Sequence, residues 1–157
     1  MMINSEKEIK IGDIISFGEY NWRVLDTKGN QALIITANII EQRAYQSDWT
    51  DTPWETCDLY KYLNGEFFDK FGNEHKSQID SDVFVLSVEE ATKYFKDDSN
   101  RRAEYKNEAC WWWLRTPGNG NLCDAVVIIS KSGYIDMTGC YVYYNNGGVR
   151  PAMWIEL

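Results

Sequence analysis

Hydrophobic and polar residues alternate near the start of the chain in a pattern that predicts a β-meander. Residues 14–17 are mostly apolar and end at Gly18, and residues 20–25 alternate ring or aliphatic side chains with polar ones. Residues 27–30 have the composition of a turn, and an apolar run at 32–36 follows them. Such alternation between turn residues is typical of antiparallel strands with one buried face. We therefore expect three consecutive strands in one half-buried sheet.

In the middle of the chain the apolar residues are spaced three and four apart, which predicts two helices. The first begins near Pro53, a residue suited to a first helical turn, and ends near Gly65. Residues 83–86 form a short apolar strand, and the capping box Ser87-Val88-Glu89-Glu90 opens the second helix. The charged, glycine-free residues 97–107 are expected to form a surface loop.

The C-terminal third is again rich in strand patterns separated by glycine turns. The expected strands are residues 111–115, 124–130, 134–137, 140–144 and 149–155. Two helices between two strand-rich ends predict an α+β fold with mixed or antiparallel strands. The final strand is expected to pair near the first.

Length and charge narrow the possible partners. A chain of 157 residues fits one domain with one core, so residues 1–157 are taken as a single domain. The net charge of −8 argues against nucleic acid, which needs a basic surface. No apolar run approaches the roughly 20 residues that span a bilayer, and the first residues lack a signal-peptide core. The expected location is cytoplasmic or phage-associated.

The sequence contains no recognisable catalytic or metal-binding motif. The four cysteines, Cys57, Cys110, Cys123 and Cys140, lack CxxC spacing, so we expect unpaired thiols and no metal site. The single histidine, His75, lies in a polar stretch that is expected to be an exposed connection. Nucleophile-elbow, phosphate-loop, dinucleotide and zinc-protease motifs are all missing, which favours a protein with no cofactor and no catalytic residue.

One acidic cluster keeps an enzymatic alternative open. It consists of Asp48, Asp51, Glu55 and Asp58. Paired carboxylates can act as a general acid and base, as in a small hydrolase. The other interpretation is a solvated acidic face.

Two arginines occupy apolar strands beside tryptophan. Arg115 follows three tryptophans and Leu114, and Arg150 lies between Val149 and Pro151. The functional interpretation is anion recognition. The structural one is a buried or stacked arginine that holds the C-terminal strands together, which we favour because an unpaired buried charge is costly.

In the segment 119–146, the residues that alternate between the two faces of the expected strands predict a contact surface on one face. If the core takes Ala125, Val127, Ile129, Ile135, Met137 and Val142, the opposite face exposes valine, isoleucine and tyrosine among short polar residues. Such a mixture is typical of binding surfaces. The alternative is a sheet that is covered on both faces.

Three motifs carry a resemblance to a known family. They are Gly18-Glu19-Tyr20-Asn21-Trp22-Arg23-Val24-Leu25-Asp26, a Trp-Trp-Leu-Arg-Thr-Pro-Gly motif at 112–118, and Gly-Val-Arg-Pro-Ala-Met-Trp at 148–154. With these motifs the chain resembles a family of uncharacterised bacterial and phage domains that is similar to C-type-lectin-like domains. Some C-type-lectin-like domains are the variable proteins of diversity-generating retroelements. The calcium and sugar motifs and the paired disulfides of true lectins are not evident here.

The resemblance implies a C-type-lectin-like scaffold at 1–118 and 147–157 around a variable, ligand-binding segment at 119–146. The candidate ligand-binding residues could all arise by adenine-specific mutagenesis of asparagine codons. They are Asn119, Asn121, Leu122, Cys123, Asp124, Val126, Ile128, Ser130, Tyr134, Asp136, Cys140, Tyr141, Tyr143, Tyr144, Asn145 and Asn146.

The leading hypothesis is therefore a non-enzymatic binding module that presents this segment to a protein or other macromolecular ligand. Tyrosine would supply contact area, and asparagine and serine would supply hydrogen bonds. The alternatives are the hydrolase described above and a structural module that uses the same face to assemble into an oligomer.

Overall fold

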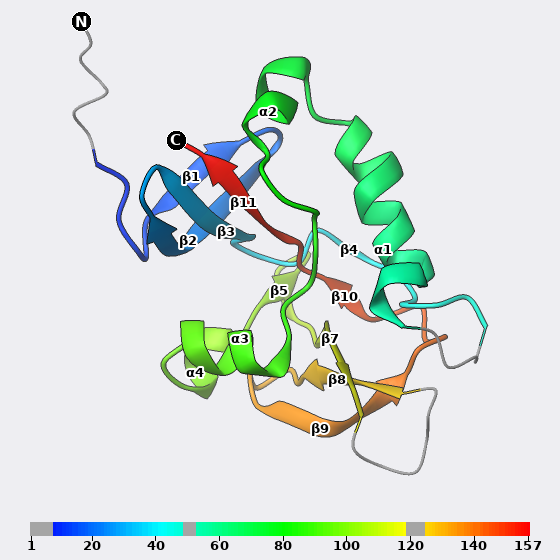
Figure 1. The fold of residues 1–157 in the computed structure, drawn as a ribbon. Helices are drawn as coiled ribbons and strands as arrows, with labels where there is room; N and C mark the ends of the chain where they lie inside the picture. Colours follow the sequence, from blue (N-terminus) through cyan, green and yellow to red (C-terminus); the bar gives the residue numbers. More distant parts are fainter. Residues whose placement is uncertain (1–7, 49–52, 119–124) are drawn as a thin grey trace, which may run out of the picture.

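The computed structural model describes residues 8–48, 53–118 and 125–157. It has an α+β fold, with strands in several sheets and short helices between them (Figure 1). None of the helices in these three ranges is long and apolar enough to cross a membrane.

A four-stranded sheet contains the predicted meander. Its strands are β1 (Ile14–Phe17), β2 (Tyr20–Lys28), β3 (Gln31–Thr36) and β11 (Ala152–Glu156), in the order β1-β2-β3-β11. All the pairs are antiparallel, and β11 aligns Met153 with Ile34. The three predicted strands are confirmed. The last strand joins this sheet through β3 rather than through the first strand, and the C-terminus lies beside the meander (Figure 1).

The helices are more numerous than the two predicted. The α-helices in the described ranges are α1 (Asp58–Tyr62), α2 (Asn73–Gln78), α3 (Val88–Tyr94) and α4 (Asp98–Arg101). A 3-10 turn, Trp54–Thr56, precedes α1, and a π-helical turn, Leu63–Phe67, continues it. The predicted stop at Gly65 is therefore wrong. A helical glycine costs only about 1 kcal/mol relative to alanine, and Leu63 and Phe67 both bury their side chains on the continued helix.

Two predicted surface segments are helical instead. His75 belongs to α2 and packs on Phe17 with 4.5 Å between ring centroids, so it is not in an exposed connection. Within 97–107, Asp97 caps α4 by accepting a hydrogen bond from the Asn100 amide. Arg101 of that helix is buried and donates from Nε to the carbonyl of Gly133.

The α3 helix begins as the sequence predicts. Ser87 accepts a hydrogen bond from the Glu90 amide at 3.2 Å, and the Glu90 carboxylate accepts one from the Ser87 amide at 2.9 Å. The preceding residues 83–86 are extended and mostly buried. Their pairing is limited to a bridge between Phe84 and Ala152.

A second, five-stranded sheet contains most of the predicted C-terminal strands (Figure 1). Its order is β4 (Glu41–Gln42), β10 (Gly148–Val149), β7 (Trp112–Pro117), β8 (Ala125–Ile129) and β9 (Ile135–Tyr141). β10 is parallel to β7, and the other pairs are antiparallel. A separate hairpin, β5 (Glu104–Tyr105) and β6 (Glu108–Ala109), precedes β7.

The strand β8, which pairs with β7 on one side and with β9 on the other, is buried on both faces. Val126 and Ile128 belong to the apolar cluster that contains Trp113. Val127 and Ile129 belong to a second cluster on the other side, with Trp112. The prediction that one face of this strand is exposed is therefore wrong, and the covered sheet that the sequence left open as an alternative is the observed one.

Candidate functional site

Both motif arginines make contacts within the protein. Nη1 of Arg115 donates to the Val85 carbonyl at 2.6 Å and to Glu90 Oε1 at 2.8 Å. Nε of Arg150 donates to the Thr36 carbonyl at 2.9 Å, and its Nη2 donates to the Ala37 carbonyl at 3.1 Å. Each arginine thus ties a C-terminal strand to an earlier part of the chain, which supports the structural interpretation.

Arg150 is the more buried of the two arginines. Its guanidinium lies 4.9 Å from the ring centroid of Trp112, and no carboxylate of the described residues pairs with it. Burial, and then the charge of Arg23, lower the pKa of Arg150 to about 9. The carbonyl and ring contacts hold the charge in a place where solvent does not reach it.

The candidate ligand-binding residues separate into those that are buried, those that hold turns and those that are exposed. Val126 and Ile128 are 6% and 5% exposed, so they are core residues and not surface contacts. Cys140 is partly buried against the same apolar cluster, and burial raises the pKa of its thiol. Five of the candidates lie outside the described residues: Asn119, Asn121, Leu122, Cys123 and Asp124.

Two polar candidates are engaged in turns. The Ser130 hydroxyl accepts a hydrogen bond from the Tyr134 amide at 3.1 Å. The Asp136 carboxylate accepts from the amide of Thr138 at 3.1 Å, from its hydroxyl at 2.7 Å and from the Gly139 amide at 3.4 Å. These bonds shape the turn before β9 and an irregularity within β9.

That irregularity contains a residue that was predicted to lie in the core. Gly139 has φ +78° and lies inside β9, where a turn was predicted. Across the irregularity, Val126 pairs with Cys140 while Ile128 pairs with Asp136, so β9 carries extra residues relative to β8. Four residues of β9 therefore span two of β8, and Met137, which was expected in the core, lies in this interruption and is 38% exposed.

The exposed candidates form an aromatic surface at the end of β9. Tyr141, Tyr143 and Tyr144, here called the tyrosine cluster, contact one another through their rings. The rings of Tyr141 and Tyr143 are stacked, with centroids 5.4 Å apart and 13° between their planes. Tyr144 stands at 82° to Tyr143, with 5.5 Å between the centroids. Tyr143 and Tyr144 are 38% and 42% exposed.

The loop that carries the tyrosine cluster is fixed from beneath. Val142 is buried, and its carbonyl accepts hydrogen bonds from the Tyr45 and Gln46 amides at 2.9 and 3.0 Å. Gly147 packs against the indole of Trp113, whose Nε1 donates to the Arg43 carbonyl at 2.8 Å. Exposed tyrosines on a firmly bonded loop need little reorganisation to meet a partner.

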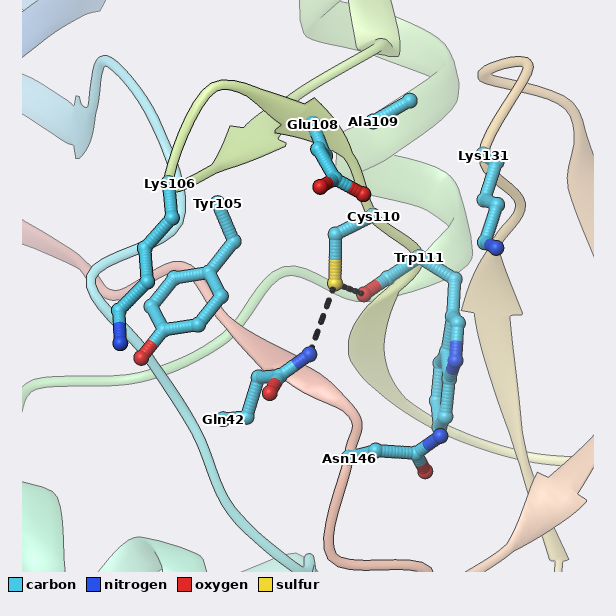
Figure 2. Close-up of a pocket in the computed structure, with 9 residues that line it drawn as sticks. All are labelled: Gln42, Tyr105, Lys106, Glu108, Ala109, Cys110, Trp111, Lys131 and Asn146. Carbon is cyan, nitrogen blue, oxygen red and sulfur yellow. Dashed lines mark hydrogen bonds between the residues drawn. The ribbon is translucent and has the colours of Figure 1, made fainter.

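A pocket of about 310 Å³ lies where this segment meets the β5–β6 hairpin (Figure 2). We call it the hairpin pocket. Lys131 and Asn146 reach it from the predicted segment, and the other lining residues come from β4 and the hairpin region: Gln42, Tyr105, Lys106, Glu108, Ala109, Cys110 and Trp111. No sequence pattern indicates this pocket, because its walls come from four separate stretches of chain.

The hydrolase alternative gains no support from the carboxylates that the structure describes. Asp58 begins α1 and accepts a hydrogen bond from the Ser47 amide at 2.7 Å, which together with the Ser47 side chain lowers its pKa. Asp48 accepts one from Gln46. Neither of these residues nor Glu55 lines the hairpin pocket, and Asp51 is outside the described ranges.

The cysteines offer no metal site within the described part of the chain. Cys57, Cys110 and Cys140 are unpaired, and Cys123 is not among the described residues. The described residues contain no cluster of three or more His, Cys, Asp or Glu side chains able to hold a metal ion. Burial raises the pKa of the Cys57 thiol, which makes it a poor nucleophile.

The fold and the surface define a small α+β domain with an exposed aromatic loop on a tightly packed scaffold. The sequence profile of a domain family described as Domain of unknown function (DUF6273) matches residues 29–85 and 72–157. Because these matches cover most of the chain, the protein belongs to this family. No curated protein and no solved structure matches the chain.

Proposed function

We propose that the protein is a non-enzymatic binding module with a C-type-lectin-like scaffold that presents the exposed part of residues 130–146 to a protein or other macromolecular ligand. The observation that carries the proposal is the tyrosine cluster. Three tyrosine rings gather at the surface, on a loop whose backbone is bonded to the residues beneath it.

Tyrosine suits this role for a physical reason. A tyrosine side chain can bury roughly 150–250 Å², and it has few rotatable bonds to immobilise when it does so. Two asparagines, Asn145 and Asn146, are exposed directly after the cluster and can adapt their hydrogen bonds to different partners. Tyr134, 54% exposed at the start of β9, adds a further ring to the exposed residues of this segment.

If the protein is a retroelement variable protein, fewer residues of the segment are free to vary than the sequence alone suggests. Substituting Val126 or Ile128 would disturb the core, and Ser130 and Asp136 hold turns. Among the described residues, the proposed contact residues are therefore Tyr134, Tyr141, Tyr143, Tyr144, Asn145 and Asn146.

The diversified version of the proposal is tested by the DNA around the gene. It requires a nearby near-copy of the 3′ end that differs at adenines, together with a reverse transcriptase. If the neighbourhood contains neither, the surface is not diversified by this mechanism, although it can still bind a ligand.

Binding itself is tested by site-specific photo-crosslinking in the cells that make the protein. A benzophenone amino acid replaces Tyr143 in one variant and Ile11, which is 65% exposed and far along the chain, in a control. We expect a discrete crosslinked species from position 143 and none from position 11. Equal crosslinking from the two positions, or none from position 143, would contradict the proposal.

Assembly through the same surface is the competing explanation. Size-exclusion chromatography of Tyr141→Ala and Tyr143→Ala separates the two. Loss of an oligomer in these variants would favour assembly, and an unchanged monomer favours ligand binding.

A further inference from the structure

The hairpin pocket contains charged groups that have no partner in the described part of the chain. Glu108, Lys106 and Lys131 all line it, and none of them forms an ion pair there. Lys106 does make a ring contact, because its ammonium lies 5.3 Å from the ring centroid of Tyr105. A carboxylate and an ammonium that share a pocket without pairing are available for a ligand that carries both charges.

The base of the pocket is ordered by a chain of hydrogen bonds. Gln42 Nε2 donates to Cys110 Sγ at 3.6 Å, and this thiol donates to the Trp111 carbonyl at 3.2 Å. Cys110 is buried. Because the amide nitrogen of Gln42 is engaged, its carboxamide oxygen, which accepts no bond from the described residues, is the group left to accept one from a ligand.

The sides of the pocket are aromatic. Figure 2 shows Tyr105 and Trp111 on opposite sides of Cys110 and Gln42, with the Glu108 carboxylate directed toward Cys110 and Lys131 on the side of Trp111. Trp111 is held by an edge-to-face contact with Trp113, 4.9 Å between centroids. Two rings at the sides and opposite charges toward one end favour a flat apolar group with a charged head.

The volume limits the size of the ligand. About 310 Å³ lies at the lower end of the roughly 300–1,000 Å³ of small-molecule pockets. A folded peptide segment is too large to enter, whereas a single amino acid fits.

We propose that the hairpin pocket binds a free aromatic α-amino acid as its zwitterion. The ammonium group of the ligand pairs with Glu108, its carboxylate pairs with Lys131, and its ring enters between Tyr105 and Trp111. This site borders the surface of the tyrosine cluster at Asn146, but the residues proposed to contact the amino acid are other ones, and the inference does not depend on the proposed function.

Isothermal titration calorimetry with three probes tests the proposal. L-phenylalanine carries both charges, L-phenylalaninamide lacks the carboxylate, and 3-phenylpropionate lacks the ammonium. We expect saturable binding of L-phenylalanine in the millimolar range or tighter, and at least about tenfold weaker binding of either analogue, since hydrogen bonds between charged groups are the strong ones. Absence of saturable binding, or equal binding of all three probes, would overturn the proposal.

Variants of Glu108 and Lys131 test which charged group of the ligand each side chain binds. Glu108→Gln should weaken L-phenylalanine but leave 3-phenylpropionate unchanged, and Lys131→Met should weaken L-phenylalanine but leave L-phenylalaninamide unchanged. Glu89→Gln and Lys93→Met remove the same charges from the exposed face of α3 and should change none of the three affinities. If the α3 variants weaken binding as much as the pocket variants, net charge and not the pocket explains the effect.

Failure of this site leaves the proposed function intact. Tyr141→Ala, introduced into the variant that carries benzophenone at position 143, should abolish the macromolecular crosslink and keep the affinity for L-phenylalanine. Loss of both in that variant, with the fold retained, would contradict the separation of the two sites.

Discussion

Replacing Gly147 with alanine should destabilise the protein strongly, because the loop of the tyrosine cluster rests directly on a buried indole. A Cβ at Gly147 would lie 2.7 Å from Cζ2 of Trp113 and closer still to Nε1. Trp113 is fully buried and donates a hydrogen bond to Arg43, so the ring cannot move without losing packing and that bond. Overpacking costs about 1–3 kcal/mol, and a lost hydrogen bond costs about 1 kcal/mol more.

The expected loss is therefore about 2–4 kcal/mol in the free energy of unfolding, which lowers Tm by roughly 4–15 °C for a chain of this size. Gly65→Ala is the matched control, because no atom lies within 4 Å of its Cβ and the residue is helical. It should stabilise the protein by about 0.5–1 kcal/mol. Urea and thermal unfolding measure both variants. If Gly147→Ala changes stability by less than about 0.5 kcal/mol, the loop does not rest on Trp113 as described.

Three further predictions concern the core, the α3 helix and pH. Ile128→Ala should cost about 2–4 kcal/mol as a core truncation, whereas Tyr134→Ala, at 54% exposed, should cost under about 0.5 kcal/mol; similar losses in urea unfolding would contradict the assigned burial. Glu90→Gln weakens the bond to Arg115 and should cost about 1–2 kcal/mol, and a double-mutant cycle with Arg115→Met should show coupling between the two side chains; additive losses would refute it. Burial, and then a hydrogen bond to Glu41, raise the pKa of Tyr62 from 10 to about 12, so stability that is present below pH 10 should fall as the pH rises through 12. Tyr62→Phe should reduce that fall and remove one late phenol from the absorbance titration, and an unchanged titration would contradict the assignment.

The sequence predicted the elements whose signals are local. The meander between residues 14 and 36 depends on alternation and turn residues, and the structure has all three strands. The capping box at Ser87 and Glu90 is likewise complete within four consecutive residues. Fold class follows from the order of such elements, so α+β could be predicted without knowing which strands pair.

The errors arose where distant parts of the chain decide the outcome. The face that a β8 residue presents depends on what covers it, and Val126 is covered by a cluster whose members come from many elements. The exposure of Met137 depends on an irregularity in which β9 carries two extra residues relative to β8, and no pattern within β9 indicates it. The short α4 helix was missed because its stability depends on a cap and on the buried Arg101 rather than on an apolar stripe.

The sequence predicted one part of the candidate site, the tyrosine cluster, but not the hairpin pocket. Tyrosine at 141, 143 and 144 indicates a contact surface by composition alone, and the rings do gather there. The hairpin pocket could not be predicted, because Gln42 and Lys131 meet only in the folded chain.

A displayed library tests the central claim, that an exchangeable binding surface rests on a fixed scaffold. A library of variants randomised at positions 134, 141, 143, 144, 145 and 146 is displayed on phage and selected against lysozyme. A matched library randomises the buried positions 126, 127, 128, 129, 142 and 149. We expect most members of the first library to keep the fold and some of them to bind lysozyme, whereas most members of the second should unfold. Equal loss of folded protein in the two libraries would contradict it.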